Sequence, residues 1–198
     1  MSGHYYSKTP EVNHNRQTHA DSLRGNPMKF VTDAGVFSKT GVDYGSRVLV
    51  ETMELQEGDR VLDVGCGYGP IGLTAARLVG SGHVTMIDIN ERAVELAKEN
   101  AKLNGITNAT ILQSDLFEAV KTERFQVILT NPPIRAGKAV VHRIFEEGYE
   151  LLQEGGSMWV VIQKKQGAPS AMDKLEAIFG EVEEVTRDKG YWILRAQK

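Results

Sequence analysis

The sequence predicts a doubly wound α/β domain, built on a mainly parallel sheet of seven strands that helices cover on both faces. First, strand-like and helix-like runs alternate from residue 59 onward, at a spacing typical of right-handed βαβ units. Second, the last two strand-like runs are joined only by "DKG" at 188–190, which predicts an antiparallel C-terminal hairpin. Third, the length of 198 residues, of which 41% are hydrophobic, fits one domain with a sizeable core.

The chain before residue 40 is less regular. Residues 1–27 are polar with little periodicity, so we expect a loosely structured N-terminal arm or an irregular cover there. Two short strand-like pieces follow, "MKFVTD" at 28–33 and "GVFSK" at 35–39. The next run has apolar residues at helical spacing, and it predicts a helix with Asp43 or Ser46 as its N-cap.

The remainder of the predicted single domain, 28–198, alternates regularly. Strand-like runs lie at 59–65, 83–89, 109–115, 124–131, 156–163, 181–187 and 190–197. Helix-like runs lie at 70–79, 91–104, 116–120, 138–153 and 168–179. Because ligands bind at the carboxyl ends of the strands in open α/β sheets, residues that directly follow each strand are the candidate site.

Composition excludes several classes of protein. No apolar run approaches membrane-spanning length, and the polar N-terminus shows no signal-peptide pattern. The one cysteine, Cys66, rules out an internal disulfide and fits a reducing cytoplasm. The five histidines and this cysteine have no zinc spacing, so we expect no metal. Because no apolar run is long enough to span a membrane, we also expect no membrane partner. The net charge of −3 does not require a nucleic-acid partner, although local basic patches permit one.

The first of these strands ends in a glycine-rich turn, "VLDVGCGYGPIGL", with Gly65, Gly67 and Gly69. Glycines there allow a tight turn and a close approach of the backbone to a ligand. Residues 67–72 also match the G-x-G-x-x-G dinucleotide pattern, and an ordinary strand-to-helix turn fits as well. Asp63 would repel a pyrophosphate, so it favours a cationic ligand over NAD.

Special residues follow four more strands. Asp88 fits a ribose-binding carboxylate or a helix N-cap, and Asp115 fits an acceptor for an adenine amino group or another cap. Asn131-Pro132-Pro133-Ile134 ends the next strand, and Gln163-Lys164-Lys165 the one after. Five such positions on one sheet edge predict a binding site.

The motifs "LDVGCGYG", "IDIN", "SDLF" and "NPPI" resemble motifs I to IV of class I S-adenosylmethionine-dependent methyltransferases. More narrowly, "GVFSKTGVDYGSRVLV" together with "NPP" resembles the small methyltransferase domain family, whose best-known activity is guanine-N2 methylation of 16S ribosomal RNA. The resemblance spans roughly residues 28–196 and implies a Rossmann-like fold with S-adenosyl-L-methionine as the cofactor.

The resemblance also implies roles for individual residues. The glycine turn would face the methionine part of the cofactor with Asp63 near its ammonium group, Asp88 would hold the ribose and Asp115 the adenine. Phe37 would close over the cofactor, although ordinary core packing explains it equally well. The implied cofactor-binding residues are Phe37, Asp63, Gly65, Gly67, Gly69, Asp88, Ser114, Asp115, Leu116 and Asn131.

The catalytic residues implied are Asn131, Pro132 and Pro133. A purine amino group is a poor nucleophile because its lone pair is delocalised into the ring. The Asn131 side-chain oxygen and the Pro132 carbonyl fit the role of two fixed acceptors that orient this lone pair, and the prolines hold them rigid. This chemistry requires no dedicated general base.

One residue departs from the family pattern. Ile134 stands where related enzymes carry an aromatic residue, which forgoes base stacking of roughly 1–3 kcal/mol. Tyr44 or a tyrosine of the N-terminal arm, Tyr5 or Tyr6, is a candidate replacement.

Basic residues near these positions favour RNA as the substrate, although each alone also fits solvated surface charge. The candidate substrate-binding residues are Ile134, Arg135, Lys138, Lys164 and Lys165, and Lys8, His142 and Arg143 add to the basic cluster. We therefore predict a cytoplasmic enzyme that methylates an exocyclic amino group in RNA, with guanine N2 of 16S ribosomal RNA as the expected target and ribosomal RNA or the small ribosomal subunit as the partner.

Two alternatives remain at this stage. Asn-Pro-Pro also serves adenine-N6 and protein glutamine-N5 methylation, and the glutamine amide needs no aromatic stacking partner. A non-catalytic binding module is the second alternative, against which the intact Asp63, Asp88 and Asn131 argue. An NAD enzyme is disfavoured by Asp63. The sequence does not define the oligomeric state.

Overall fold

A mixed seven-stranded sheet forms the centre of the molecule in the computed structural model, which describes residues 6–198. The strand order is β5-β4-β3-β6-β7-β9-β8, with parallel pairing from β5 to β7 and antiparallel pairing of β9 with both neighbours. The predicted fold, including the C-terminal hairpin, is confirmed. The strands are β3 (Arg60–Val64), β4 (His83–Asp88), β5 (Ala109–Gln113), β6 (Phe125–Thr130), β7 (Leu152–Gln163), β8 (Val182–Asp188) and β9 (Tyr191–Gln197).

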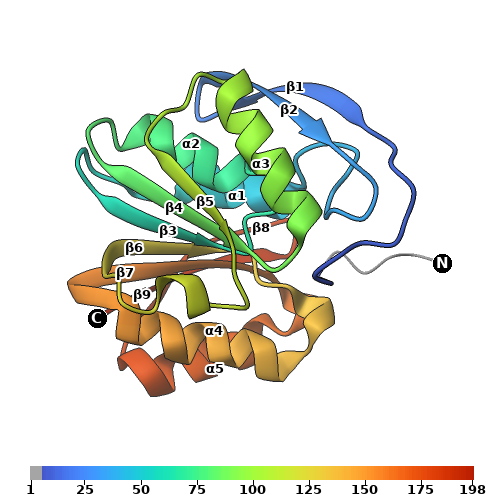
Figure 1. Cartoon of the computed structure of the whole chain (residues 1–198). Helices are drawn as coiled ribbons and strands as arrows, with labels where there is room; N and C mark the ends of the chain where they lie inside the picture. Colours follow the sequence, from blue (N-terminus) through green and yellow to red (C-terminus); the bar gives the residue numbers. More distant parts are fainter. Residues whose placement is uncertain (1–5) are drawn as a thin grey trace.

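Helices cover both faces of this sheet (Figure 1). One face is packed by α1 (Tyr44–Thr52), α2 (Pro70–Leu78) and α3 (Glu91–Leu103). The other is packed by α4 (Lys138–Leu151) and α5 (Ala168–Phe179). Single turns of 3₁₀ helix are η1 (Glu118–Val120), η2 (Ile134–Ala136) and η3 (Lys164–Gln166). No helix between residues 6 and 198 combines the length and apolar character needed to cross a bilayer.

The N-terminal region differs from the prediction. β1 (Gln17–Leu23) lies within the expected arm and pairs antiparallel with β2 (Asn26–Thr32). Positive φ angles at Arg24 and Gly25 make the tight turn between them. In β1 only Leu23 is buried, so the sequence lacks the alternation that reveals a strand. The expected strand at 35–39 is wrong, because the chain turns there, with positive φ at Gly35 and Ser38.

Carboxamides on α3 hold β2 against the domain. Asn100 accepts a hydrogen bond from the Val31 amide (2.7 Å) and donates to the Val31 carbonyl (3.0 Å). Asn104 does the same for the backbone of Lys29. These side chains replace a neighbouring strand for the outer edge of β2, which would otherwise leave its backbone groups unpaired.

The helix caps in the structure decide between alternative roles that the sequence left open for Asp43, Ser46 and Asp88. Asp43, one of the two predicted candidates, is the N-cap of α1 and accepts from the Ser46 amide (3.1 Å). Asn90, not Asp88, caps α3 by accepting from the Ala93 amide (3.2 Å). The cap interpretation of Asp88 is therefore wrong, and its carboxylate is available for another role.

Candidate functional site

A cavity of about 320 Å³ opens at the carboxyl edge of the sheet, in the size range of small-molecule sites. The segments that follow β3, β4, β5 and β6 all contribute to its wall. The predicted site residues that line it are Phe37, Gly65, Gly67, Asp88, Ser114, Asp115, Leu116, Asn131, Pro132 and Pro133. The predicted residues Asp63, Gly69, Ile134, Arg135, Lys138, Lys164 and Lys165 are not part of this lining.

The glycine turn after β3 gives the cavity its floor. Gly65 and Gly67 have φ angles of 73° and 58°, and a Cβ built on either would meet no atom within 4 Å. Their free side therefore faces open space that a side chain would fill. Gly69 has a different role: a Cβ there would approach the Leu73 side chain to 2.8 Å, so its absence permits close packing of α2.

Asp88 ends β4 at the wall of this cavity. Its Oδ2 accepts a hydrogen bond from the Gly67 amide (2.8 Å), and its Oδ1 accepts from the Asn90 amide (2.9 Å). Each oxygen keeps a lone pair toward a ligand. Burial raises the pKa of Asp88 to about 6, although these backbone hydrogen bonds favour the charged form. Such a carboxylate is suited to accept the two hydroxyls of a ribose.

Asp63 lies beneath the glycine turn, not in the cavity. It is 1% exposed, and neither of its carboxylate oxygens reaches a hydrogen-bond partner of normal geometry within residues 6–198. Burial raises its pKa to about 7, the nearby charge of Asp88 adds to this, and the Gly72 amide in the first turn of α2 offsets part of it. The structure therefore does not bring Asp63 into contact with the space that the other predicted residues surround.

The turn after β5 forms another part of the cavity wall. Ser114 Oγ donates to the Leu116 carbonyl (2.7 Å) and accepts from the Ala119 amide (3.0 Å). These bonds stabilise the turn in which Leu116 adopts a φ of 48°, uncommon for a residue with a side chain. Phe37 lies at the same cavity with 42% of its surface exposed, so core packing does not explain it.

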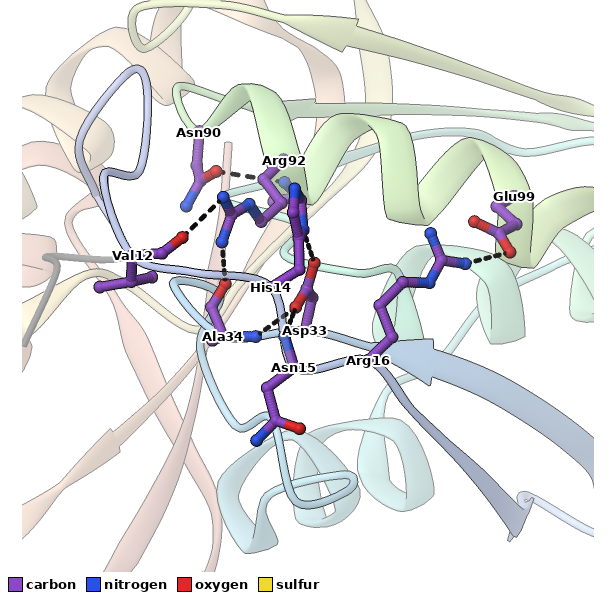
Figure 2. Close-up of polar contacts among 10 residues, drawn as sticks. Val12, His14, Asn15, Arg16, Asp33, Ala34, Asn90, Arg92 and Glu99 are labelled. Carbon is purple, nitrogen blue, oxygen red and sulfur yellow. Dashed lines mark hydrogen bonds and ion pairs between the residues drawn. The ribbon is translucent and has the colours of Figure 1, made fainter.

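The N-terminal segment also reaches the cavity, through Tyr6. Figure 2 shows how this segment is held. Arg92, in the first turn of α3, donates to the carbonyls of Val12 (3.0 Å) and Ala34 (2.7 Å), and the Glu91 amide donates to the Lys8 carbonyl (2.9 Å). The arm is thus fastened to the start of α3 and to the loop that carries Phe37.

Asp33 is the second anchor of the arm. Its carboxylate accepts from the backbone amides of Asn15 (2.6 Å) and Ala34 (2.8 Å), and His14 Nδ1 lies 2.5 Å from it (Figure 2). Burial raises the pKa of Asp33, but the hydrogen bonds from His14 and these amides outweigh burial and lower it overall. Arg16 adds an exposed ion pair with Glu99 (2.5 Å).

Asn131 lies where β6 leaves the sheet, next to the N-terminus of α1. Its Nδ2 donates to Asp43 Oδ2 (3.2 Å) and to Ser46 Oγ (3.1 Å). The preceding Thr130 bonds to the Val64 carbonyl (3.0 Å), which ties the end of β6 to β3. Sequence reasoning assigned Asp43 and Ser46 only to helix capping, whereas both also line the cavity.

The predicted substrate residues lie outside the lining of the cavity. Ile134 is half-buried and packs against the core that α4 and α5 share with the sheet. Arg135 and Lys138 are exposed after β6, and Lys164 and Lys165 are exposed after β7. Ile134 therefore contributes to packing, and the four cations lie on the outer surface.

The tyrosines considered as replacements for an aromatic at position 134 have separate places. The Tyr44 hydroxyl donates to Asp188 (2.5 Å), and its ring contacts Lys189 Nζ at 4.7 Å and the Tyr191 ring at 5.8 Å. Tyr44 thus joins α1 to the turn of the β8–β9 hairpin. Tyr6 lines the cavity, and Tyr5 lies outside the described residues.

Within residues 6–198, no group of three or more His, Cys, Asp or Glu side chains is arranged to hold a metal ion. The cavity instead offers carboxylate oxygens, a glycine turn without side chains, and apolar walls from Phe37 and Leu116. This combination suits a ligand with hydroxyl groups and a flat ring, such as a nucleoside.

The sheet with its antiparallel hairpin and the cavity at its carboxyl edge define a Rossmann-like methyltransferase. The chain belongs to the methyltransferase small domain family, whose sequence model matches residues 27–195. The chain is therefore a class I methyltransferase, and its cofactor is S-adenosyl-L-methionine. The family resemblance of the sequence motifs is confirmed.

Relatives and solved structures agree with this membership. The chain is 56% identical over its whole length to the uncharacterized protein YbxB of Bacillus subtilis (strain 168), all of whose length it covers. It is 30% identical to ribosomal RNA large subunit methyltransferase G of Pseudomonas putida (strain W619), covering 86% of this chain and 46% of that protein.

Among solved structures, it is similar to the 16S rRNA N2 G1207 methyltransferase RsmC of T. thermophilus, in complex with AdoMet and guanosine. The TM-score is 0.84 and the identity 28%, over 96% of this chain and 52% of that one. The chain therefore spans about half the length of these ribosomal RNA methyltransferases.

Proposed function

We propose that this protein transfers a methyl group from S-adenosyl-L-methionine to the exocyclic amino group of guanine in ribosomal RNA, with N2 of a 16S guanine as the target. The observation that carries the proposal is the Asn131 carboxamide, which lies at the wall of the cavity with its nitrogen bonded away to α1. Its oxygen is then the atom available to a ligand.

The cavity fits the cofactor. Gly65 and Gly67 present a side-chain-free floor, Asp88 would accept from the ribose hydroxyls, and Asp115 and Leu116, which also line the cavity, would contact the adenine. When bound, S-adenosyl-L-methionine supplies an electrophilic methyl group on a sulfonium that is a good leaving group. The task that remains for the protein is to present the nucleophile.

Asn131 and Pro132 would perform this task. The amino group of guanine carries two N–H donors, and two fixed acceptors that bind both of them orient the nitrogen lone pair in one direction. The Asn131 oxygen and the Pro132 carbonyl are successive acceptors on a segment stiffened by two prolines, so their positions are set before the substrate arrives. The step requires no dedicated general base, which matches the lack of a histidine in the Asn131-Pro132-Pro133-Ile134 motif.

The surface supports RNA as the substrate. Arg143 and Lys174 are engaged in ion pairs with Glu147 and Glu146. By contrast, Arg135, Lys138, Lys164 and Lys165 are exposed and form no ion pair with another residue in 6–198. These four cations follow β6 and β7, neighbouring strands of the sheet, and we propose that they contact phosphates on either side of a target base. A base within a helix would be extruded at a cost of a few kcal/mol.

We further propose that residues 28–198 form a single methyltransferase domain, and that the N-terminal arm before it contacts the cofactor through Tyr6. A cytoplasmic location follows from a ribosomal RNA substrate. The relatives named above act on large-subunit RNA in one case and on 16S RNA in the other, by their names. The choice of 16S rests on the structural similarity to RsmC, and the test therefore includes both RNAs.

The test is incubation of the purified protein with methyl-labelled cofactor and, in parallel, stripped 16S RNA, stripped 23S RNA, assembled subunits and a peptide release factor. We expect label in 16S RNA or in the small subunit. Label only in 23S RNA would reject the 16S target and keep the RNA activity. Label only in the release factor would instead identify a glutamine methyltransferase, and no cofactor binding by calorimetry would identify a non-catalytic module.

A further inference from the structure

We propose that Asp43 and Ser46 are positioning residues that hold the Asn131 carboxamide with its oxygen toward the cavity. This inference rests on the proposed function, in which that oxygen accepts a hydrogen bond from the target amine. It assigns a second purpose to the N-terminus of α1, beyond capping a helix. Asn131 is 88 positions from Asp43 and 85 positions from Ser46 in the chain.

The orientation of the carboxamide follows from the chemistry of its partners. The nitrogen lies 3.2 Å from Asp43 Oδ2 and 3.1 Å from Ser46 Oγ. An ionised carboxylate can only accept hydrogen bonds, so the end of the Asn131 amide that faces Asp43 must be the NH₂ group. A flipped amide would bring its own oxygen to the same place, against a carboxylate oxygen. Both N–H groups are thus engaged at the N-terminus of α1, which leaves Oδ1 as the end of the amide that is free for a ligand of the cavity.

The support of this orientation is rigid. Asp43 is held as the N-cap by the Ser46 amide, at 3.1 Å from the same Oδ2. Ser46 is 3% exposed, and Leu49 and Val50, one turn further along α1, are fully buried against the sheet. The two partners of the carboxamide nitrogen are therefore held in place by a helix that is part of the core.

The orientation of the Asn131 amide decides whether the target amine meets a hydrogen-bond acceptor or a donor. An amine that donates two N–H groups needs two acceptors, and the NH₂ end of a flipped Asn131 would oppose it with a donor. Without Asp43, the two orientations of the amide differ little in energy, and the productive one is populated only part of the time. Donation to a charged acceptor also polarises the amide and strengthens its oxygen as an acceptor.

The variant that tests this is Asp43→Asn. Asparagine keeps the size and the capping ability of the aspartate, but its own carboxamide can donate as well as accept, so it no longer dictates the orientation of Asn131. We expect kcat to fall at least tenfold while the cofactor Kd and the melting temperature change little. Asp59→Asn is the matched control, because Asp59 accepts from the Gln56 amide (2.8 Å) on the surface, away from the cavity lining, and its kcat should stay at the wild-type value.

A second measurement does not depend on activity. In ¹⁵N-labelled protein, the side-chain amide protons of Asn131, assigned by their loss in Asn131→Ala, should exchange with solvent at least tenfold more slowly than those of Asn15. In Asp43→Asn this protection should be lost. Protected protons in a protein that methylates no RNA would reject the proposed function and leave the positioning in place. Unprotected protons in the wild type, or a wild-type kcat in Asp43→Asn, would overturn the positioning.

Discussion

Asp88 offers a prediction whose size can be worked out from the structure. Its pKa in the ligand-free protein is raised to about 6 by burial, and only the ionised form accepts both ribose hydroxyls. The apparent affinity for the cofactor is reduced by the fraction of protein in which Asp88 is protonated. At pH 5, about one molecule in eleven carries the charge, so the cofactor Kd should be roughly tenfold higher than at pH 7.5, where nearly all do.

The substitution Asp88→Asn removes this titration. It also replaces one of the two charged acceptor oxygens by an NH₂ group, so one hydrogen bond worth about 1.5–3 kcal/mol is lost and the cofactor Kd at pH 7.5 should rise by roughly 10- to 150-fold. At pH 5 the ratio of the variant's cofactor Kd to that of the wild type should be about tenfold smaller than at pH 7.5, because Asp88 of the wild type is then mostly protonated. Asp63 is present in both proteins, so the comparison isolates Asp88.

The assay is titration calorimetry with S-adenosyl-L-methionine between pH 5 and 8 at constant ionic strength, with a thermal melt at each pH to show that both proteins are folded. We expect the ratio of the two dissociation constants to fall with decreasing pH. Parallel loss of affinity in the wild type and Asp88→Asn would refute the assignment of Asp88 as the ribose acceptor.

Three further predictions concern other parts of the site. Asn131→Ala should lower kcat by roughly 10²- to 10³-fold with the cofactor Kd within about twofold, as measured by single-turnover methylation and calorimetry; a large change in Kd would contradict the separation of roles. Arg92→Ala removes one hydrogen bond that fastens the arm at Val12 and one that holds the Phe37 loop at Ala34, each worth about 1 kcal/mol, so it should weaken cofactor binding several-fold. The exposed Arg16→Ala should leave binding unchanged, and equal effects of the two variants would argue against an arm and loop that close the cavity. Asp63→Asn should stabilise the cofactor-free protein at pH 8. The carboxyl has its pKa raised from 3.8 to about 7 by burial, so its contribution to stability falls as pH rises from about 4 to 7. Measured by urea denaturation, the gain in unfolding free energy should be on the order of 4 kcal/mol at pH 8 and near zero at pH 4. The same gain at both pH values would show that ionisation of Asp63 is not the cause.

Much of the sheet and its site is predictable because the signals are local. Each strand of the parallel part is an apolar run followed at once by its special residue, as with Asp88 after β4 and Asn131 after β6. Since parallel strands end at one edge, sequence position alone brings these side chains together. The glycine turn is equally local, although only the structure separates Gly65 and Gly67, which face the cavity, from Gly69, which serves packing.

The remainder depends on contacts between distant segments. The pairing of Asn131 with Asp43 joins residues 88 positions apart, and no local pattern at Asp43 distinguishes it from an ordinary N-cap. Asp63 has the spacing of a ligand residue, but the direction of its side chain is set by how the turn packs over α2. Ile134 shows the same limit: its packing into the α4–α5 core depends on a surface that the sequence around it does not reveal.

The central claim is that Asn131 and Pro132 present a guanine amino group to a methyl donor. The most direct test is mass spectrometry of nucleosides from 16S RNA treated with the purified protein and deuterated S-adenosyl-L-methionine. The account predicts deuterated N2-methylguanosine with the wild type and none with Asn131→Ala. Deuterium in N6-methyladenosine alone, or in no nucleoside of any RNA tested, would contradict it.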